Sequence, residues 1–158
     1  DRSVSRGLGD VYKRQPYDSW QKDVLLQNVR LGVICPNVHT DIFKSFLQRL
    51  NTTIQANDNS DYIQPYTGFH SIYKTLLEIP DNGTDKWINI EATPKDTLSL
   101  ARSICLQANS LADKYPGIVI VIFIPASWSI HRQFKHNGES FDLHNYIKAY
   151  AAQHRFTT

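Results

Sequence analysis

The apolar run IVIVIFI, Ile118–Ile124, decides the fold that this sequence predicts. Gly117 precedes the run and Pro125 follows it, and both residue types interrupt regular structure. An unbroken run of mostly β-branched residues between such breaks is typical of a strand buried on both faces. We therefore expect residues 117–125 to form the central strand of a parallel sheet.

Earlier parts of the chain repeat a strand followed by a helix. Val29–Cys35 is a β-rich run and Trp87–Ala92 alternates, so both predict strands. Apolar residues at helical spacing follow, over Thr40–Leu50 and over Thr93–Ala112, each behind a threonine cap. A short helix is expected over Phe69–Leu77. This order predicts an α/β class, a Rossmann-like three-layer domain with a small parallel sheet flanked by helices.

The stretch FDLHNYIKAYAA, Phe141–Ala152, predicts the last helix, with Asp142 as its N-cap and an apolar stripe behind it. His144 and Lys148 stand four residues apart and share the opposite face. Two nitrogen donors near a helix N-terminus, where backbone N–H groups are also unpaired, favour an anion such as phosphate. The alternative is that two polar side chains simply face solvent.

The segment between this helix and the apolar run, Ala126–Ser140, is expected to be a loop. Ligands of parallel α/β sheets bind beyond the carboxyl ends of the strands, where this loop would lie. It mixes aromatic and basic residues, as stacking on a base beside its phosphate requires. The residues that could contact a nucleic acid are Trp128, His131, Arg132 and Lys135. The alternative is an ordinary mobile surface loop.

Composition limits the other classes of function. The formal net charge of +2 gives no overall argument for nucleic acid, so any such argument must be local. The two cysteines, Cys35 and Cys105, are expected to be free and buried, which suits a cytoplasmic protein. His131, His136 and His144 match no common zinc spacing, so no metal site is expected. No nucleophile or nucleotide-binding motif is present, and no catalytic residue is assigned.

Segments of the chain from about Pro16 to Thr158 resemble the MID domain of prokaryotic Argonautes of the short type. The resemblance rests on PYDSW, VRLGVICP, DYIQPYTGFHSIYKTLLEIP, IVIVIFIP and FDLHNYIKAYAAQ. It implies that residues 29–158 form a MID-like domain that binds the guide 5′ end and includes the first residues of a PIWI domain, with the chain truncated before the rest of PIWI. Residues 16–28 are an approach segment, and residues 1–15 resemble translated sequencing-adapter read-through rather than native sequence.

The resemblance also implies a function. His144 and Lys148 match the two positions that hold the 5′ phosphate of a small guide RNA or DNA, which directs recognition of complementary target DNA in prokaryotic defence. The fragment would need no cofactor, although a divalent metal could sit at the guide phosphate in the full-length protein. The implied partner is an effector subunit with an APAZ-type region, sirtuin-like or TIR-type, and no membrane is involved.

Catalysis is not expected of this chain. The slicer carboxylates of Argonautes belong to the PIWI region that would follow, and short Argonautes generally lack them. A second hypothesis, from another class, is a small α/β enzyme that processes nucleotides or phosphoesters. Its site would lie in the same region, Ala126–Lys148.

Overall fold

The computed structural model describes residues 28–55, 64–91 and 96–158 of the chain. The chain divides into two compact units. Within the described residues, the smaller unit holds Asn28, 49–55 and 64–77, and the larger holds 29–48, 78–91 and 96–158. The predicted adapter-like segment 1–15, and residues 16–27 of the approach segment, lie outside the described part of the chain.

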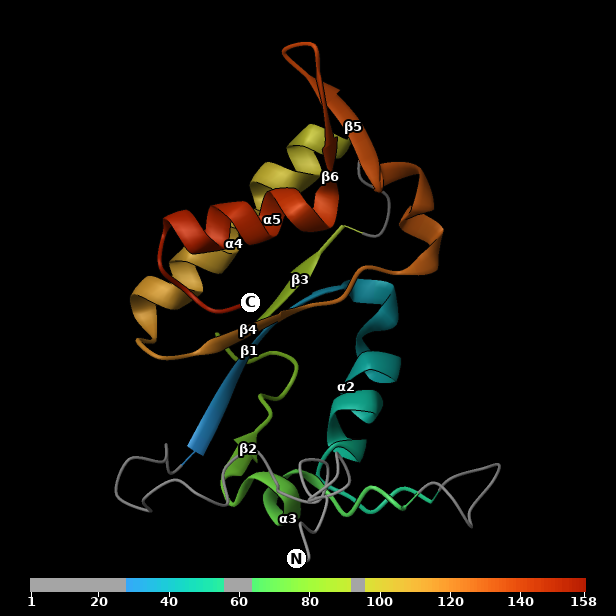
Figure 1. Ribbon diagram of the computed structural model, residues 1–158, viewed down its shortest axis with the longest axis vertical. Helices are drawn as coiled ribbons and strands as arrows, with labels where there is room; N and C mark the ends of the chain where they lie inside the picture. Colours follow the sequence, from blue (N-terminus) through green and yellow to red (C-terminus); the bar gives the residue numbers. More distant parts are fainter. Residues whose placement is uncertain (1–27, 56–63, 92–95) are drawn as a thin grey trace, which may run out of the picture. The chain divides into compact units, whose positions relative to one another are not determined.

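The main sheet has four strands, three of them parallel, which confirms the predicted α/β class (Figure 1). The strands are β1 (Asn28–Pro36), β2 (Leu76–Glu78), β3 (Trp87–Ile90) and β4 (Val119–Ile122). β1 pairs in parallel with both β3 and β4, since Ile34 lies opposite Ile88 on one side and opposite Ile122 on the other.

The prediction that residues 117–125 form the central strand is wrong. β1 holds that place, and its last six residues, Leu31–Pro36, are all buried. Of the four residues of β4, only Ile120 is buried. On the side away from β1, β4 is joined by a single bridge, in which the Ile120 N–H donates to the Thr157 carbonyl at 2.9 Å. An apolar run shows that a strand is largely covered, but the order of strands is decided by which edges pair.

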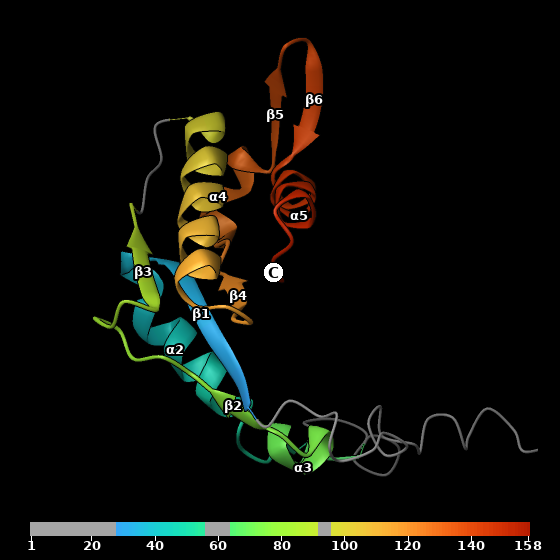
Figure 2. The same cartoon turned by 90° about the vertical axis from the view of Figure 1, so that its left-hand side faces the viewer.

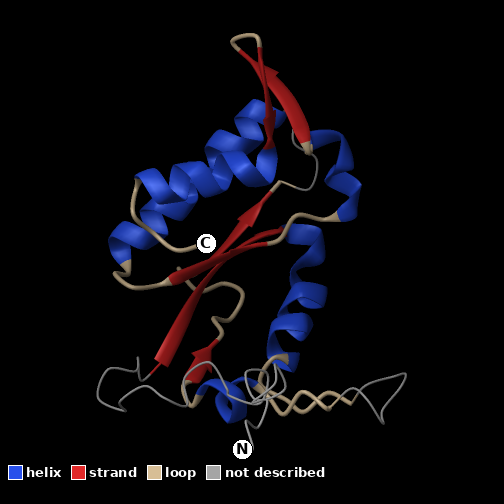
Figure 3. Ribbon diagram, in the orientation of Figure 1, coloured by secondary structure: helices blue, strands red, loops and turns tan. Residues whose placement is uncertain are grey.

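Among the described residues, four α-helices and two 3₁₀-helices accompany the strands; Figure 3 shows helices and strands in different colours. The α-helices are α2 (Thr40–Arg49), α3 (Phe69–Tyr73), α4 (Thr97–Lys114) and α5 (Leu143–Gln153), and the 3₁₀-helices are η2 (Asn37–His39) and η3 (Ala126–His131).

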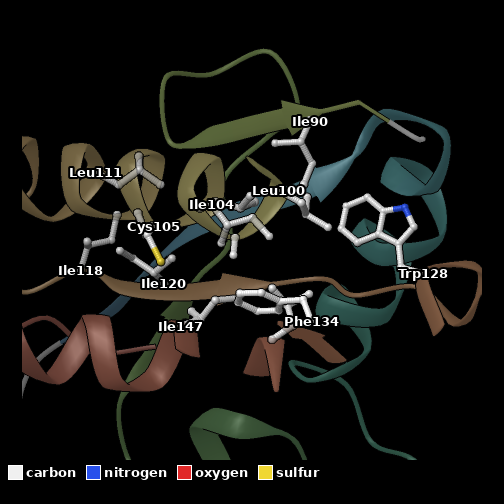
Figure 4. Packing of buried hydrophobic residues seen from close by; sticks show 14 residues of the cluster. Ile90, Leu100, Ile104, Cys105, Leu111, Ile118, Ile120, Trp128, Phe134 and Ile147 are labelled. Carbon is white, nitrogen blue, oxygen red and sulfur yellow. The ribbon is translucent and has the colours of Figure 1, made fainter. Parts of the chain in front are cut away.

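Helices cover both faces of the parallel strands of the larger unit. On one face, the Phe43 ring of α2 packs against Trp87 and Phe123, at centroid distances of 6.3 and 4.8 Å. On the other, α4 and α5 enclose the main core cluster, in which Ile104 and Ile120 are almost completely buried (Figure 4). Helices and sheet thus form three layers, as the sequence predicts.

The contact between α4 and the sheet is close at Gly32. A Cβ atom at this position of β1 would lie 3.0 Å from Ile118 Cδ1 and 3.3 Å from Leu111 Cδ1. These distances are shorter than ordinary van der Waals contacts. Glycine therefore lets the end of α4 and the chain after it approach the sheet.

Three helix predictions need correction. α4 begins at Thr97 and not at Thr93, because the Asp96 carboxylate accepts the Ser99 N–H at 2.8 Å and caps the helix. Thr93 itself lies outside the described residues. Thr40 does not cap α2, since its hydroxyl donates to Asn89 Oδ1 at 3.1 Å. Of the apolar residues expected to form the buried stripe of α2, Phe43 and Leu47 are buried, whereas Ile42 and Phe46 are exposed to solvent.

The expected helix over Phe69–Leu77 is shorter than predicted. α3 ends at Tyr73, because Lys74 adopts the left-handed conformation at φ 57°. The chain then enters β2, where Leu77 is buried and Leu76 is 52% exposed. Leucine fits either conformation, so its spacing alone does not locate this change.

The loop predicted over Ala126–Ser140 is also wrong. After η3 the chain forms an antiparallel hairpin of β5 (Gln133–His136) and β6 (Glu139–Asp142), visible beyond α5 in Figure 2. Asn137 and Gly138 form its turn with φ values of 50° and 82°. Asn-Gly at the centre of a two-residue turn is the sequence signal that predicts such a hairpin.

Candidate anion-binding site

The predicted start of α5 is confirmed. The Asp142 carboxylate accepts the Asn145 N–H at 3.0 Å, which satisfies a backbone donor that the first helical turn leaves unpaired. Leu143, Ile147 and Ala151 are buried, so one stripe of the helix packs against the core. This packing determines where the remaining faces of α5 point.

The exposed residues His144 and Lys148 line one hollow, of about 260 Å³. Its other walls are Ile147, apolar residues of β4 and the chain after it, and Thr158 near the bridge that Thr157 makes with Val119. The tertiary structure therefore brings the helix face, the side of β4 and the last described residues into one site. Spacing along the helix predicts only the first of these three.

Three residues with polar side chains, His144, Lys148 and Thr158, line this hollow. The Lys148 ammonium donates a hydrogen bond to the carbonyl oxygen of Thr158. The Thr158 hydroxyl oxygen is buried and has no hydrogen-bond partner among the described residues. His144 Nδ1 lies 3.4 Å from Asn145 Oδ1, so its closest polar contact in the described structure is an amide rather than a carboxylate.

This donor set suits an oxyanion. An ammonium supplies a point charge, and an imidazole supplies a hydrogen-bond donor. Apolar walls lower the local dielectric, which strengthens interactions of the charges with a bound anion. The Lys148 ammonium already donates to one oxygen acceptor, the carbonyl of Thr158.

A larger hollow, of about 440 Å³, lies between β3 and α4. Its described lining includes the carboxylates of Glu91 and Asp96 and contains no lysine, arginine or histidine. A phosphate would be repelled there. Charge rather than volume therefore makes the hollow beside α5 the better candidate for an anion site.

Trp128, predicted to contact a guide base, lies elsewhere. Its side chain is 2% exposed and belongs to the core cluster with residues of α4 and the hairpin (Figure 4). A base cannot stack on a ring that the protein already covers on both faces. The aromatic residue that the sequence presents as a ligand contact is thus part of the core, because η3 folds back onto the sheet.

The three basic residues predicted beside Trp128 remain accessible to different degrees. His131 is half-buried, and its Nδ1 lies 2.8 Å from the Thr97 hydroxyl at the start of α4. Arg132 and Lys135 are exposed at the base and in the first strand of the hairpin. None of the three lines the hollow that holds His144 and Lys148. They are therefore available for contacts outside it, and His131 also ties η3 to α4.

Sequence reasoning missed a second feature of α5. A hollow of about 390 Å³ lies along another face of this helix, lined by Phe141, Asn145, Tyr146, Ala149, Tyr150 and Gln153. The spacing of Tyr146 and Tyr150, four residues apart, could have indicated a shared aromatic face. The sequence could not have indicated that Phe141 lines the same hollow, because its position depends on the hairpin.

The described residues 28–55, 64–91 and 96–158 contain no group of three His, Cys, Asp or Glu side chains arranged to hold a metal ion. Within the same ranges, the helices lack the length and apolar character that a bilayer crossing requires. No family model matches the sequence, and no curated protein matches it either.

Proposed function

We propose that this chain is a MID-like domain of a short prokaryotic Argonaute and that it binds the 5′-phosphorylated end of a small nucleic-acid guide. The observation that carries the proposal is that His144 and Lys148 line one hollow together with Thr158, whose buried hydroxyl has no hydrogen-bond partner among the described residues. In this proposal the chain anchors the guide and does not catalyse a reaction. Guided recognition of complementary DNA, with an effector subunit as partner, follows from the family resemblance.

Lys148 has the largest role in this proposal. Its ammonium would exchange the Thr158 carbonyl for a phosphate oxygen, which carries a formal charge and is the stronger acceptor. His144, one helical turn earlier, would donate a second hydrogen bond. The arrangement offers no carboxylate to His144 among the described residues, which favours anchoring over general-base chemistry.

The direct test compares two RNAs of one sequence, one with a 5′ phosphate and one with a 5′ hydroxyl, by fluorescence anisotropy. The ratio of their dissociation constants isolates the phosphate contact. In wild type we expect the phosphate to strengthen binding clearly. Lys148→Ala should reduce this advantage by about 1.5 kcal/mol, or roughly tenfold, which is the lower end for a charge-assisted contact because Lys148 is exposed.

Lys135→Ala is the matched control, since it removes the same exposed charge from the hairpin and outside the hollow. It should weaken the binding of both RNAs equally and leave the ratio of their dissociation constants unchanged. If wild type does not distinguish the two RNAs, or if Lys148→Ala keeps the full ratio, the hollow is not the phosphate site and the proposal fails.

His144 adds a test by substitution. Its imidazole would donate one hydrogen bond to the phosphate, so His144→Ala should reduce the phosphate advantage by about 1 kcal/mol, or roughly fivefold. A variant that keeps the full ratio would exclude His144 from the phosphate contact.

A further inference from the structure

The hollow on the second face of α5 has aromatic walls and an uncharged polar rim. Phe141 and Tyr146 stand at one end with their ring centroids 5.9 Å apart, edge to face. Tyr150 stands at the other end and stacks on His154 at 4.1 Å. Ala149 lies between them, and its small side chain leaves the hollow open.

Neighbouring rings fix these walls in place. Phe134 contacts both Phe141 and Tyr146, each at 5.6 Å, so the hairpin holds one end rigidly. At the other end, Phe156 lies 6.3 Å from Tyr150. Aromatic side chains that are already ordered lose little conformational entropy when a planar group stacks on them.

The amides of Asn145 and Gln153 complete the lining. An amide donates and accepts hydrogen bonds, so it can meet any base edge without selecting one. The six lining residues include no charged side chain. Such a surface suits a planar, polar group rather than an ion.

The part of the chain that forms this hollow has a net positive charge. Residues 131–158 contain four lysines and arginines against two carboxylates, and so a formal net charge of +2, which equals that of the whole chain. One of the carboxylates, Asp142, is engaged as the cap of α5. Four of the six histidines lie in the same stretch, among them His136 and His154 at the two ends of the hollow. This stretch therefore carries a net positive charge, and Arg132 and Lys135 are exposed in it.

We propose that this face of α5 binds the bases of a single-stranded nucleic acid with little sequence preference, separately from the 5′-phosphate contact. Rings that accept stacked bases beside cations that attract the backbone are the two parts of such a surface. The inference does not depend on the phosphate hollow, because the six residues that line this face are all different from those that line the other.

The test uses oligonucleotides of thymidine or uridine, about 12 nucleotides long, with a 5′ hydroxyl and a fluorophore at the 3′ end. Ala149→Glu and Gln153→Glu place a carboxylate in the hollow at exposed positions that the fold tolerates. Each should weaken binding at low salt by about tenfold, because the new carboxylate blocks stacking of a base and repels the phosphate backbone. Circular dichroism verifies that the variants are folded.

Ala152→Glu is the matched control, because Ala152 is exposed on the same helix and lines neither hollow. It introduces the same charge and should weaken binding by no more than about threefold, through long-range repulsion alone. Equal effects of the three substitutions would mean that only net charge matters, and this would overturn the proposal. The proposal would also fail if none of the three substitutions weakened binding.

Photocrosslinking gives an independent readout that needs no substitution. An oligonucleotide with a photoreactive pyrimidine should attach to Tyr146 or Tyr150, and mass spectrometry of the peptides locates the bond. Crosslinks found only at other residues would exclude this face. Because all these oligonucleotides lack a 5′ phosphate, failure here leaves the phosphate test unaffected, and failure of the phosphate test leaves this one unaffected. Equal behaviour of RNA and DNA is expected, since stacking does not need the 2′ hydroxyl.

Discussion

Replacing Trp128 with alanine should lower the free energy of unfolding by about 3–5 kcal/mol, the usual cost of removing a large aromatic side chain from a core. The indole is 2% exposed and lies in the cluster that joins η3, the hairpin and α4. In a domain of this size each kcal/mol corresponds to about 2–4 °C, so the melting temperature should fall by roughly 6–20 °C. Affinity for a phosphorylated oligonucleotide should stay within about twofold where both proteins are folded.

Urea unfolding followed by circular dichroism measures the stability change, and anisotropy measures the binding. The control is Ile130→Ala in the same 3₁₀-helix, because Ile130 is 79% exposed and its loss should cost less than about 0.5 kcal/mol. If Trp128→Ala costs less than about 1 kcal/mol, the assignment of Trp128 to the core is wrong. If the substitution weakens binding without changing stability, Trp128 contacts the ligand.

Three further outcomes are expected. Gly32→Ala should cost about 1–3 kcal/mol in urea unfolding, because the new Cβ would lie 3.0 Å from an isoleucine side chain; an unchanged midpoint would contradict this packing. Asp142→Ala should cost about 1 kcal/mol through loss of the α5 cap, whereas Asp142→Asn should cost only a few tenths; equal losses would contradict the capping role. Burial raises the pKa of the Cys35 and Cys105 thiols to about 11, so native protein should react slowly with a thiol reagent at pH 8 and quickly in urea. Because the unfolded thiols ionise near pH 9, their contribution to stability should be lost as the pH rises from about 9 to about 11, and Cys→Ala variants should show a smaller loss.

Local patterns were sufficient for much of the fold. The strand Val29–Cys35, the helix behind Asp142 and the alternation of strands with helices follow from apolar periodicity and from capping chemistry, which act over a few residues. The same local rule places His144 and Lys148 on one face of a helix. An Asn-Gly pair also marked the hairpin, although its segment was predicted as a loop.

Residues distant in sequence determined the rest. Which strand is central depends on the pairing of β1 with both of its neighbours, and a strand's own composition does not record its partners. Trp128 looked like a ligand contact because an aromatic residue among basic ones suits a nucleic acid, yet the folding back of η3 buries it. Likewise, the sequence alone placed two nitrogen donors on α5, but only the tertiary structure brought Thr158 and β4 beside them. Spacing along one helix determines which side chains share a face, whereas a site needs walls from several elements, and long-range packing decides where those lie.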